Sequence, residues 1–272
     1  MLYVVATPIG NLEDFSRRGA EVLGSVAMIA AEDTRRTRVL LEAIGVPGVP
    51  VLALHSHNET AASETVLAHL RDGAAVALVS DAGTPLLSDP GFELVRACWE
   101  EGIAVLPVPG ASAVAAVLSI CPLPGARFMF EGFLPAKPAA RDGRLRVLLE
   151  AGMAVVFFEA PHRMAATLED LDRLAPERRV VIGREMTKRH EQYLYDLPGA
   201  LLRTLTAGGH LKGEFVCVLE GGRSETTPDD ARRTMEILVR ELSPTQAARL
   251  GAQLLGRSRR ELYGLAVSLR DA

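Results

Sequence analysis

The sequence predicts an α/β protein with two α/β domains followed by a small helical module. Two observations favour this fold class. Short apolar runs alternate with amphipathic helical stretches over most of the 272 residues, which is typical of sheets covered by helices. Near the C-terminus, three helix-start signals follow one another with no strand between them. We place the domains at residues 1–118, 119–222 and 227–272.

The first domain is predicted from five short apolar runs, at 2–6, 28–31, 51–54, 75–79 and 103–107. Helical patterns follow four of them, at 16–25, at 57–71, at 90–101 and in a stretch that ends at Gly45. The runs are continuous rather than alternating between apolar and polar residues. We therefore expect a mostly parallel sheet that helices cover on both faces.

The second domain begins after Pro- and Gly-rich segments at 107–109 and 121–125, which flank a predicted helix over 112–119. Its predicted strands are 127–131, 154–158, 179–184 and 214–219, and its predicted helices are 141–150, 163–174 and 198–206. A polar linker over 221–226 leads to three helices, whose starts are marked by Thr227-Pro228, Ser243-Pro244-Thr245-Gln246 and Ser258-Arg259-Arg260-Glu261. These helices indicate either a helix-turn-helix-like module or a packing appendage or dimer arm.

Composition excludes several classes of protein. With 48% hydrophobic and 24% charged residues, the chain can bury a core and is not a disordered tail. Its longest stretch of small apolar residues, 111–121, is far shorter than the ~20 residues that span a bilayer. The start of the chain lacks a signal-peptide pattern, and the three cysteines are far apart. We expect a cytoplasmic protein with no membrane segment and no metal.

Charge is unevenly distributed along the chain. The formal net charge is −4, which on its own argues against a nucleic-acid partner. Residues 1–110 carry −7, however, whereas residues 111–272 carry +3 and residues 231–272 carry +4. Of the 30 basic residues, 27 are Arg. This excess reflects either genomic base composition or recognition of phosphates by the guanidinium fork.

Three rigid loops follow predicted strands of the first domain. They are Thr7–Asn11, Ser80–Pro85 and Pro107–Ala113, all rich in Gly and Pro. Ligands of open α/β sheets bind beyond the carboxyl ends of the strands, where such loops let the backbone approach closely. The alternative is ordinary turn chemistry. The sequence contains no dinucleotide fingerprint, phosphate-binding P-loop or nucleophile elbow, and His55 and His57 lack a third metal ligand nearby.

Polar side chains gather at four other strand ends, in the segments 32–35, 55–58, 159–163 and 184–188. General-base candidates by position are Glu32, Asp33, His57, Glu159, His162 and Glu185. Candidates for holding phosphates are Arg35, Arg36, Arg163 and Lys188. Any one of these side chains could instead form a helix cap or a salt bridge. Together they indicate an anionic, polar substrate.

Eight segments, in this order, resemble one family: 2–12, 31–35, 57–58, 80–91 (SDAGTPLLSDPG), 109–113, 132–135, 159–163 (EAPHR) and 184–188. They resemble the tetrapyrrole methylase superfamily and, more narrowly, the ribosomal RNA small subunit methyltransferase I (RsmI) family. The terminal helices also resemble that family's C-terminal domain.

The resemblance implies two α/β domains with a cofactor cleft between them, and homodimers. It implies transfer of a methyl group from S-adenosylmethionine to the ribose 2′-OH of a cytidine, cytidine 1402, in 16S rRNA of the 30S subunit. The implied cofactor contacts are Pro8, Asp81, Ala82, Gly83, Thr84, Pro85, Ser112, Ala113, Phe158 and Met186. Expected substrate contacts are Arg35, Arg36, Asn58, His162, Arg163 and Lys188, and base candidates are Glu32, Asp33 and His57.

Two other functions stay open from the sequence. A corrin-pathway methyltransferase acting on a tetrapyrrole would use the same cofactor fold. A non-enzymatic ribosome assembly factor would need no rigid cofactor pocket, so stoichiometric binding of S-adenosylmethionine separates it from both enzymes.

Overall fold

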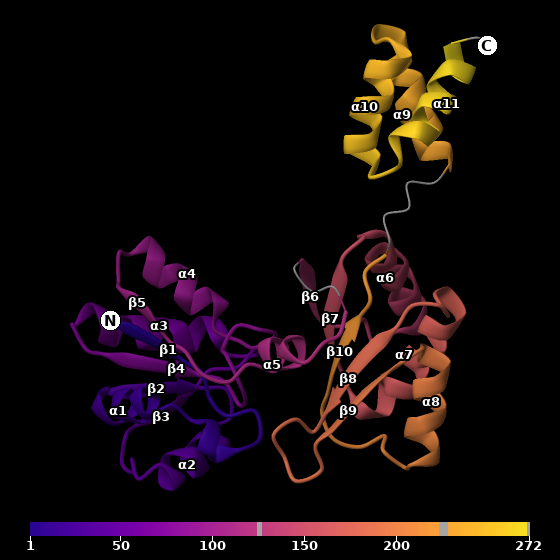
Figure 1. Cartoon of the computed structure of the whole chain (residues 1–272). Coiled ribbons are helices and arrows are strands. Elements are labelled where there is room, and N and C mark those ends of the chain that lie inside the picture. The colour runs from indigo at the N-terminus through magenta and orange to yellow at the C-terminus, as the bar shows by residue number, and fades with distance from the viewer. Residues whose placement is uncertain (124–126, 223–227, 271–272) are drawn as a thin grey trace. The chain divides into compact units, whose positions relative to one another are not determined.

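A computed structural model of the chain describes residues 1–123, 127–222 and 228–270. The chain divides into two compact units, Met1–Gly221 and Gly222–Ala272, and each is described by itself. The first unit contains two five-stranded sheets, and the second contains helices (Figure 1). This architecture confirms the predicted fold class. The boundary placed between residues 118 and 119 stays a prediction.

The first sheet is entirely parallel, as the continuous apolar runs predict. Its strand order is β3-β2-β4-β1-β5. The strands are β1 (Leu2–Val5), β2 (Met28–Ala31), β3 (Val51–Ala53), β4 (Val76–Val79) and β5 (Val105–Val108). Because all five strands run the same way, their carboxyl ends meet at one edge of the sheet. That edge carries the three Gly- and Pro-rich loops.

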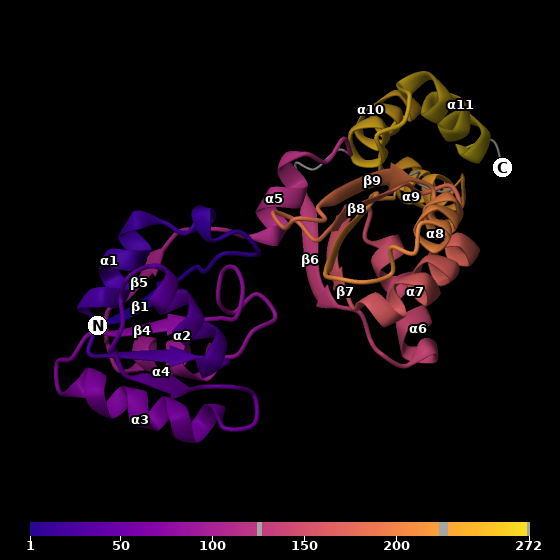
Figure 2. The same cartoon turned by 90° about the horizontal axis from the view of Figure 1, so that it is seen from below.

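Helices cover both faces of this sheet. One face packs against α1 (Arg17–Ser25) and α2 (Thr34–Ala43), and the other packs against α3 (Glu59–Arg71) and α4 (Phe92–Glu100) (Figure 2). A short 3₁₀ helix, η1 (Leu12–Asp14), lies in the loop after β1. The prediction of a doubly covered sheet is confirmed.

The second sheet is mixed, with the order β6-β7-β10-β8-β9. Its strands are β6 (Phe128–Phe133), β7 (Ala154–Glu159), β8 (Val180–Arg184), β9 (Gln192–Asp196) and β10 (Phe215–Leu219). The sequence pattern does not predict β9. This strand pairs only with β8 and exposes Tyr193 and Tyr195, so it lacks the continuous apolar run that marks a buried strand.

Helices also cover both faces of the second sheet. The face toward the first sheet carries α5 (Ala113–Ser119), and the other face carries α6 (Pro138–Glu150), α7 (Pro161–Leu174) and α8 (Pro198–Ala207) (Figure 1). Both α6 and α7 begin a few residues earlier than predicted, at a proline. Proline suits the first turn because it has no backbone N–H, and an N–H at that position would find no acceptor within the helix.

The second unit is a three-helix cluster of α9 (Pro228–Glu241), α10 (Pro244–Leu255) and α11 (Arg259–Arg270). The predicted capping box at Ser243 is present, with Gln246 as its partner. The helices bury a core of their own, centred on Met235, Ala248 and Leu262. The predicted cap at Thr227 and most of the linker over 221–226 lie outside the described residues. No helix in the described ranges is long and apolar enough to cross a membrane.

We predict that Leu262→Asp unfolds the second unit alone, because it places a carboxylate in that unit's separate core. Hydrogen exchange followed by mass spectrometry should show lost protection in α9–α11 and unchanged protection in the two sheets. The matched control is Leu254→Asp, since Leu254 is exposed. Loss of protection in both units would contradict the independence of the two cores.

Candidate active site between the two sheets

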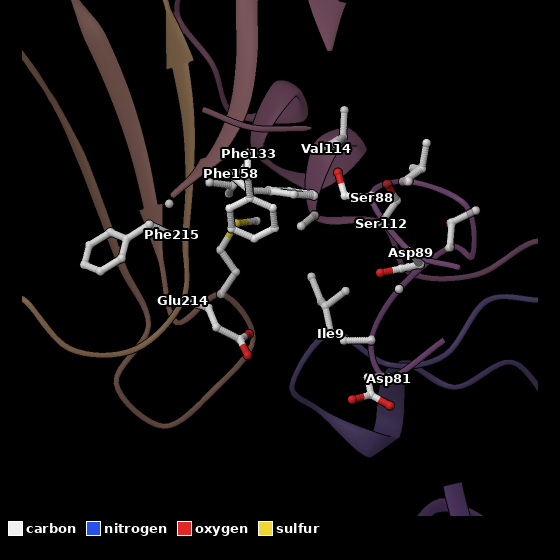
Figure 3. Close-up of a pocket in the computed structure, with 18 of the residues that line it drawn as sticks. Ile9, Asp81, Ser88, Asp89, Ser112, Val114, Phe133, Phe158, Glu214 and Phe215 are labelled. Atoms are coloured by element: carbon white, nitrogen blue, oxygen red, sulfur yellow. The ribbon is translucent and has the colours of Figure 1, made fainter. Parts of the chain in front are cut away.

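A cavity of about 380 Å³ lies between the carboxyl-end loops of the first sheet and the inner face of the second. Loops after β1, β2, β4 and β5 form one wall, and β6, β7, β8, β10 and the loops at their ends form the other. Figure 3 shows side chains from the two walls facing each other across it. A cavity of this size can enclose much of a small organic ligand.

One loop, residues 80–85, joins the loops of the first wall. Thr7 and Gly83 exchange two backbone hydrogen bonds, with N···O distances of 2.8 and 3.0 Å. The Thr84 hydroxyl donates to the Ala111 carbonyl at 3.2 Å. The Asp33 N–H donates to the Asp81 carboxylate at 2.9 Å. Because these bonds reach the loops after β1, β2 and β5, a single loop fixes the shape of this wall.

Glycine permits the closest approaches in the wall. Gly83 has φ +82°, and a Cβ there would lie 3.2 Å from Cγ2 of Ile9, a cavity-lining side chain. Gly10 lies against the loop after β8, so that a Cβ on it would be 3.0 Å from the Met186 carbonyl oxygen. The loops of the two sheets therefore touch beside the cavity.

Strained backbone flanks two side chains that line the cavity. Leu86 and Ser88, on either side of Leu87, have φ values of +72° and +77°. Glu185 and Thr187, on either side of Met186, have φ values of +50° and +64°. Non-glycine residues adopt this region at a cost of order 1–3 kcal/mol each, and they do so where the surrounding structure imposes it.

The second wall is largely apolar. The Phe158 ring lies 5.2 Å from that of Phe130 and 5.5 Å from that of Phe133, centroid to centroid. Phe133 is 54% exposed although it lines the cavity, so its ring is available to a ligand. Met186 completes the wall and is buried. This surface suits the flat or apolar part of a ligand.

The first wall is acidic. Glu32, Asp81 and Asp89 all line it, and Arg36 is paired with Asp81 at 3.3 Å. Burial, together with the charges of Glu32 and Asp81, raises the pKa of Asp89 to about 6. Burial and the neighbouring Asp81 also raise the pKa of Glu32. These carboxyl groups can therefore exchange protons closer to neutral pH than ordinary ones.

The structure brings many of the predicted site residues to this cavity. Those that line it are Glu32, Arg36, Asp81, Ala82, Gly83, Thr84, Ser112, Ala113, Phe158, Glu159 and Met186. Ser112 is also the N-cap of α5, where its hydroxyl accepts from the Ala115 N–H at 3.4 Å. Pro85 is buried behind the loop. Pro8 lines a second cavity of about 160 Å³, which shares Arg36 and Asp81 with the first.

Three predicted residues lie in local structure outside the cavity lining. Asp33 caps α2 and binds Arg35 through two side-chain hydrogen bonds, which hold the pKa of the Asp33 carboxyl far below its usual range. Asn58 folds the turn before α3, accepting from the His55 N–H and donating to the Ala53 carbonyl. His57 is exposed beside this turn.

The remaining predicted cations are placed as follows. Arg163 donates to the carbonyls of Leu134 and Pro135 and pairs at 3.0 Å with the fully buried carboxylate of Glu159. Lys188 pairs with Glu185 at 3.0 Å and with Glu214 at 2.8 Å. Both side chains are therefore engaged within the fold. His162 is exposed on the first turn of α7.

Several lining residues were not among the predicted site residues. They include Ile9, Leu87, Ser88, Asp89, Val114, Phe133, Gly183, Glu214, Phe215 and Val216. Asp89 lies in the 80–91 segment that carries the family resemblance, but the sequence assigns it no role. The available signal is its place ten residues after the end of the buried strand β4. Among the described residues, no group of three or more His, Cys, Asp or Glu side chains is arranged to hold a metal ion.

Comparison with known proteins identifies the fold. Residues 1–199 match the family model of Tetrapyrrole (Corrin/Porphyrin) Methylases. A solved structure of uroporphyrin-III C-methyl transferase from Thermus thermophilus, complexed with S-adenyl homocysteine, superposes with a TM-score of 0.56 at 19% identity. It covers 80% of this chain and 96% of the other. The two sheets thus have the fold of the tetrapyrrole methylase class.

Closer relatives narrow this class. The chain is 48% identical to ribosomal RNA small subunit methyltransferase I of Xylella fastidiosa, over 97% of both chains. It is 44% identical to the protein of the same name from Escherichia coli O157:H7, over 98% of this chain and 94% of the other. Residues 225–270 match the model of the RsmI C-terminal HTH domain. The chain therefore belongs to the ribosomal RNA small subunit methyltransferase I family.

We predict that Arg163→Met destabilises the protein by about 3–5 kcal/mol, because it leaves the buried Glu159 carboxylate without its cation. Urea denaturation followed by circular dichroism measures the loss. The control is Arg35→Met, which removes an 86% exposed partner of Asp33 and should cost at most about 1 kcal/mol. Equal losses for the two variants would show that Arg163 has no special structural role.

Proposed function

We propose that the protein is an S-adenosylmethionine-dependent methyltransferase that acts on the RNA of the small ribosomal subunit. In its finer form, the proposal is 2′-O-methylation of cytidine 1402 in 16S rRNA. One observation carries it: the family's characteristic segments at 80–85, 112–113 and 186 come together around one cavity. This occurs in a chain that aligns over nearly its whole length with relatives named as ribosomal RNA methyltransferases.

The cavity fits such a cofactor in size and chemistry. S-adenosylmethionine has no phosphate, and Arg36 is the single cation among the described residues that line the cavity. The backbone of 82–84 and the apolar surface of Phe158 and Met186 would hold its adenosine and methionine parts. The acidic wall favours a ligand that carries a positive sulfonium. Bound there, the cofactor supplies a methyl group activated by that sulfonium.

The chain's own residues would position the acceptor. Rate in such a transfer comes largely from alignment, with the reacting atoms about 3–3.5 Å apart. Arg36, which lines the first wall, and the exposed Arg35 beside it in the sequence would hold RNA phosphates. A homodimer and a role for the C-terminal helices in RNA binding are part of the same proposal.

A tetrapyrrole substrate is less favoured by the comparisons. The relatives that align over nearly the whole chain are named as ribosomal RNA methyltransferases, whereas the uroporphyrin-III C-methyl transferase is only 19% identical. An assembly factor without catalysis would not need the strained loops around Leu87 and Met186.

We predict that the protein methylates 30S particles from a strain that lacks this modification, using S-adenosylmethionine with a labelled methyl group. Mass spectrometry of nuclease digests should place one methyl on one 16S rRNA cytidine, on the ribose. Free tetrapyrrole substrates serve as the control and should take up no label. Methylation of a base, or of a tetrapyrrole alone, would contradict the proposal, and stoichiometric cofactor binding without transfer would reduce it to a binding function.

A further inference from the structure

One carboxyl group of the acidic wall differs from its neighbours. Asp81 accepts a hydrogen bond from the Asp33 N–H and forms an ion pair with Arg36. Glu32 accepts from the Asp81 N–H at 3.4 Å. Among the described residues, Asp89 forms no ion pair and accepts no hydrogen bond from a backbone N–H, and the nearby Ser80 side chain lowers its pKa. Asp89 lines the cavity and is the least engaged of the three carboxyl groups on this wall.

We propose that Asp89 is the base that accepts the proton of the target hydroxyl, an inference that rests on the methyl transfer proposed above. Figure 3 shows its carboxylate directed into the cavity, on the same side as Asp81 and facing the wall that carries Phe158. The sequence analysis placed this role among Glu32, Asp33 and His57. Asp33 is instead committed to Arg35, and His57 does not line the cavity.

Contacts on both sides of Asp89 constrain the segment that carries it. Ser88, with φ +77°, packs against β6, so that a Cβ on Gly132 would lie 2.7 Å from the Ser88 hydroxyl oxygen. On the other side, Glu59 accepts from the N–H groups of Gly91 and Glu93 at 2.9 and 3.1 Å. A base fixed on both sides can keep a constant distance to its substrate.

Electrostatics give this carboxyl group a suitable basicity. Burial, then Glu32 and Asp81, raise its pKa to about 6, and Ser80 acts in the opposite direction. The other charged residues that line the cavity are Arg36 on α2 and, from the second wall, Glu214 and Glu159, whose buried carboxylate is paired with Arg163. A base with a pKa near neutrality is ionised at physiological pH and still accepts a proton more readily than an ordinary carboxylate.

The proposed reaction moves a methyl group to the ribose oxygen and a proton to Asp89. The ribose oxygen gains the methyl carbon as the carbon–sulfur bond breaks, and the electron pair of that bond stays on sulfur. The hydroxyl proton moves to a carboxylate oxygen of Asp89. The neutral Asp89 carboxyl group then releases its proton to water, which restores the base.

Kinetics test the assignment directly. In Asp89→Asn we expect kcat on 30S particles to fall by about 10²- to 10⁴-fold with little change in KM for S-adenosylmethionine. The wild-type kcat should decline below pH 6, and this decline should be absent from the residual activity of the variant. Asp89→Glu should restore part of the rate. The matched control is Asp72→Asn, at the exposed C-cap of α3, which should behave as wild type.

A second readout needs no substrate. A raised pKa means that the folded state holds the Asp89 proton between about pH 4 and 6 while the unfolded chain has released it. Wild-type Tm should therefore fall relative to that of Asp89→Asn as pH rises through this window, and the difference should stay constant above it. Asp72→Asn should show no such trend.

The outcomes are distinct. An unchanged kcat in Asp89→Asn, with or without a higher KM for the cofactor, overturns the role of Asp89 as the base. So does a Tm difference that is independent of pH. Failure of the wild-type protein to methylate 30S particles contradicts the proposed function instead, while leaving the pH dependence of Tm as a test of Asp89 alone.

Discussion

The hydrogen bonds made by the 80–85 loop are the constraint on which the site depends. This loop follows β4, the central strand of the first sheet, and is tied to the loops after β1, β2 and β5. The bonds run through backbone groups of Thr7 and Gly83, the Thr84 hydroxyl and the Asp81 carboxylate. Because buried backbone groups must be paired, the four loops can adopt few other arrangements without leaving one of them unsatisfied. The parallel sheet thus acts as the scaffold that brings these loop residues together.

The two walls of the cavity differ in chemistry because loops form one of them and a sheet face forms the other. Loops at a sheet edge carry polar residues, and here they supply Glu32, Asp81 and Asp89. The opposite wall is the inner face of a sheet and supplies Phe133 and Phe158. A ligand that is cationic at one point and flat elsewhere matches this pair of walls, and the proposed cofactor has both properties. The residues on either side of Leu87 and of Met186 have positive φ values, so the surrounding structure fixes the backbone that carries these two apolar side chains.

Sequence patterns predict the scaffold well. The apolar runs at 28–31 and 76–79 are buried on both faces, so their signal is strong, and the three Gly- and Pro-rich loops follow such runs. Strand β9 escapes prediction because an exposed edge strand needs only one apolar side chain, Leu194, to face the core. These differences have one physical source. A buried strand shows itself as a continuous apolar run in its own residues. An exposed edge strand has no such run, because its pairing with the neighbouring strand stabilises it.

Side-chain roles are less predictable because partners are distant in sequence. Arg163 bonds to carbonyls 28 and 29 residues away, and Lys188 pairs with Glu214, 26 residues away. Each cation also has an acidic residue three or four positions before it, Glu185 or Glu159, but the sequence alone does not show that the two residues pair. Asp89 shows the converse, since burial and then the charges of Glu32 and Asp81 raise its pKa, and these surroundings are set by the fold. The family resemblance identified the loops, and the structure was needed to distinguish the individual side chains within them.

The central claim is that the 80–85 loop forms the cofactor site, and calorimetric titration of Gly83→Ala with S-adenosylhomocysteine tests it most directly. Gly83 and Gly73 have nearly equal φ values, +82° and +84°, so alanine strains both backbones alike. Only at Gly83 does the new Cβ meet a cavity residue, Ile9, whereas nothing lies within 4 Å at Gly73. We expect at least about tenfold weaker binding, or about 1.4 kcal/mol, for Gly83→Ala and wild-type affinity for Gly73→Ala. Equal affinity in both variants would contradict the claim.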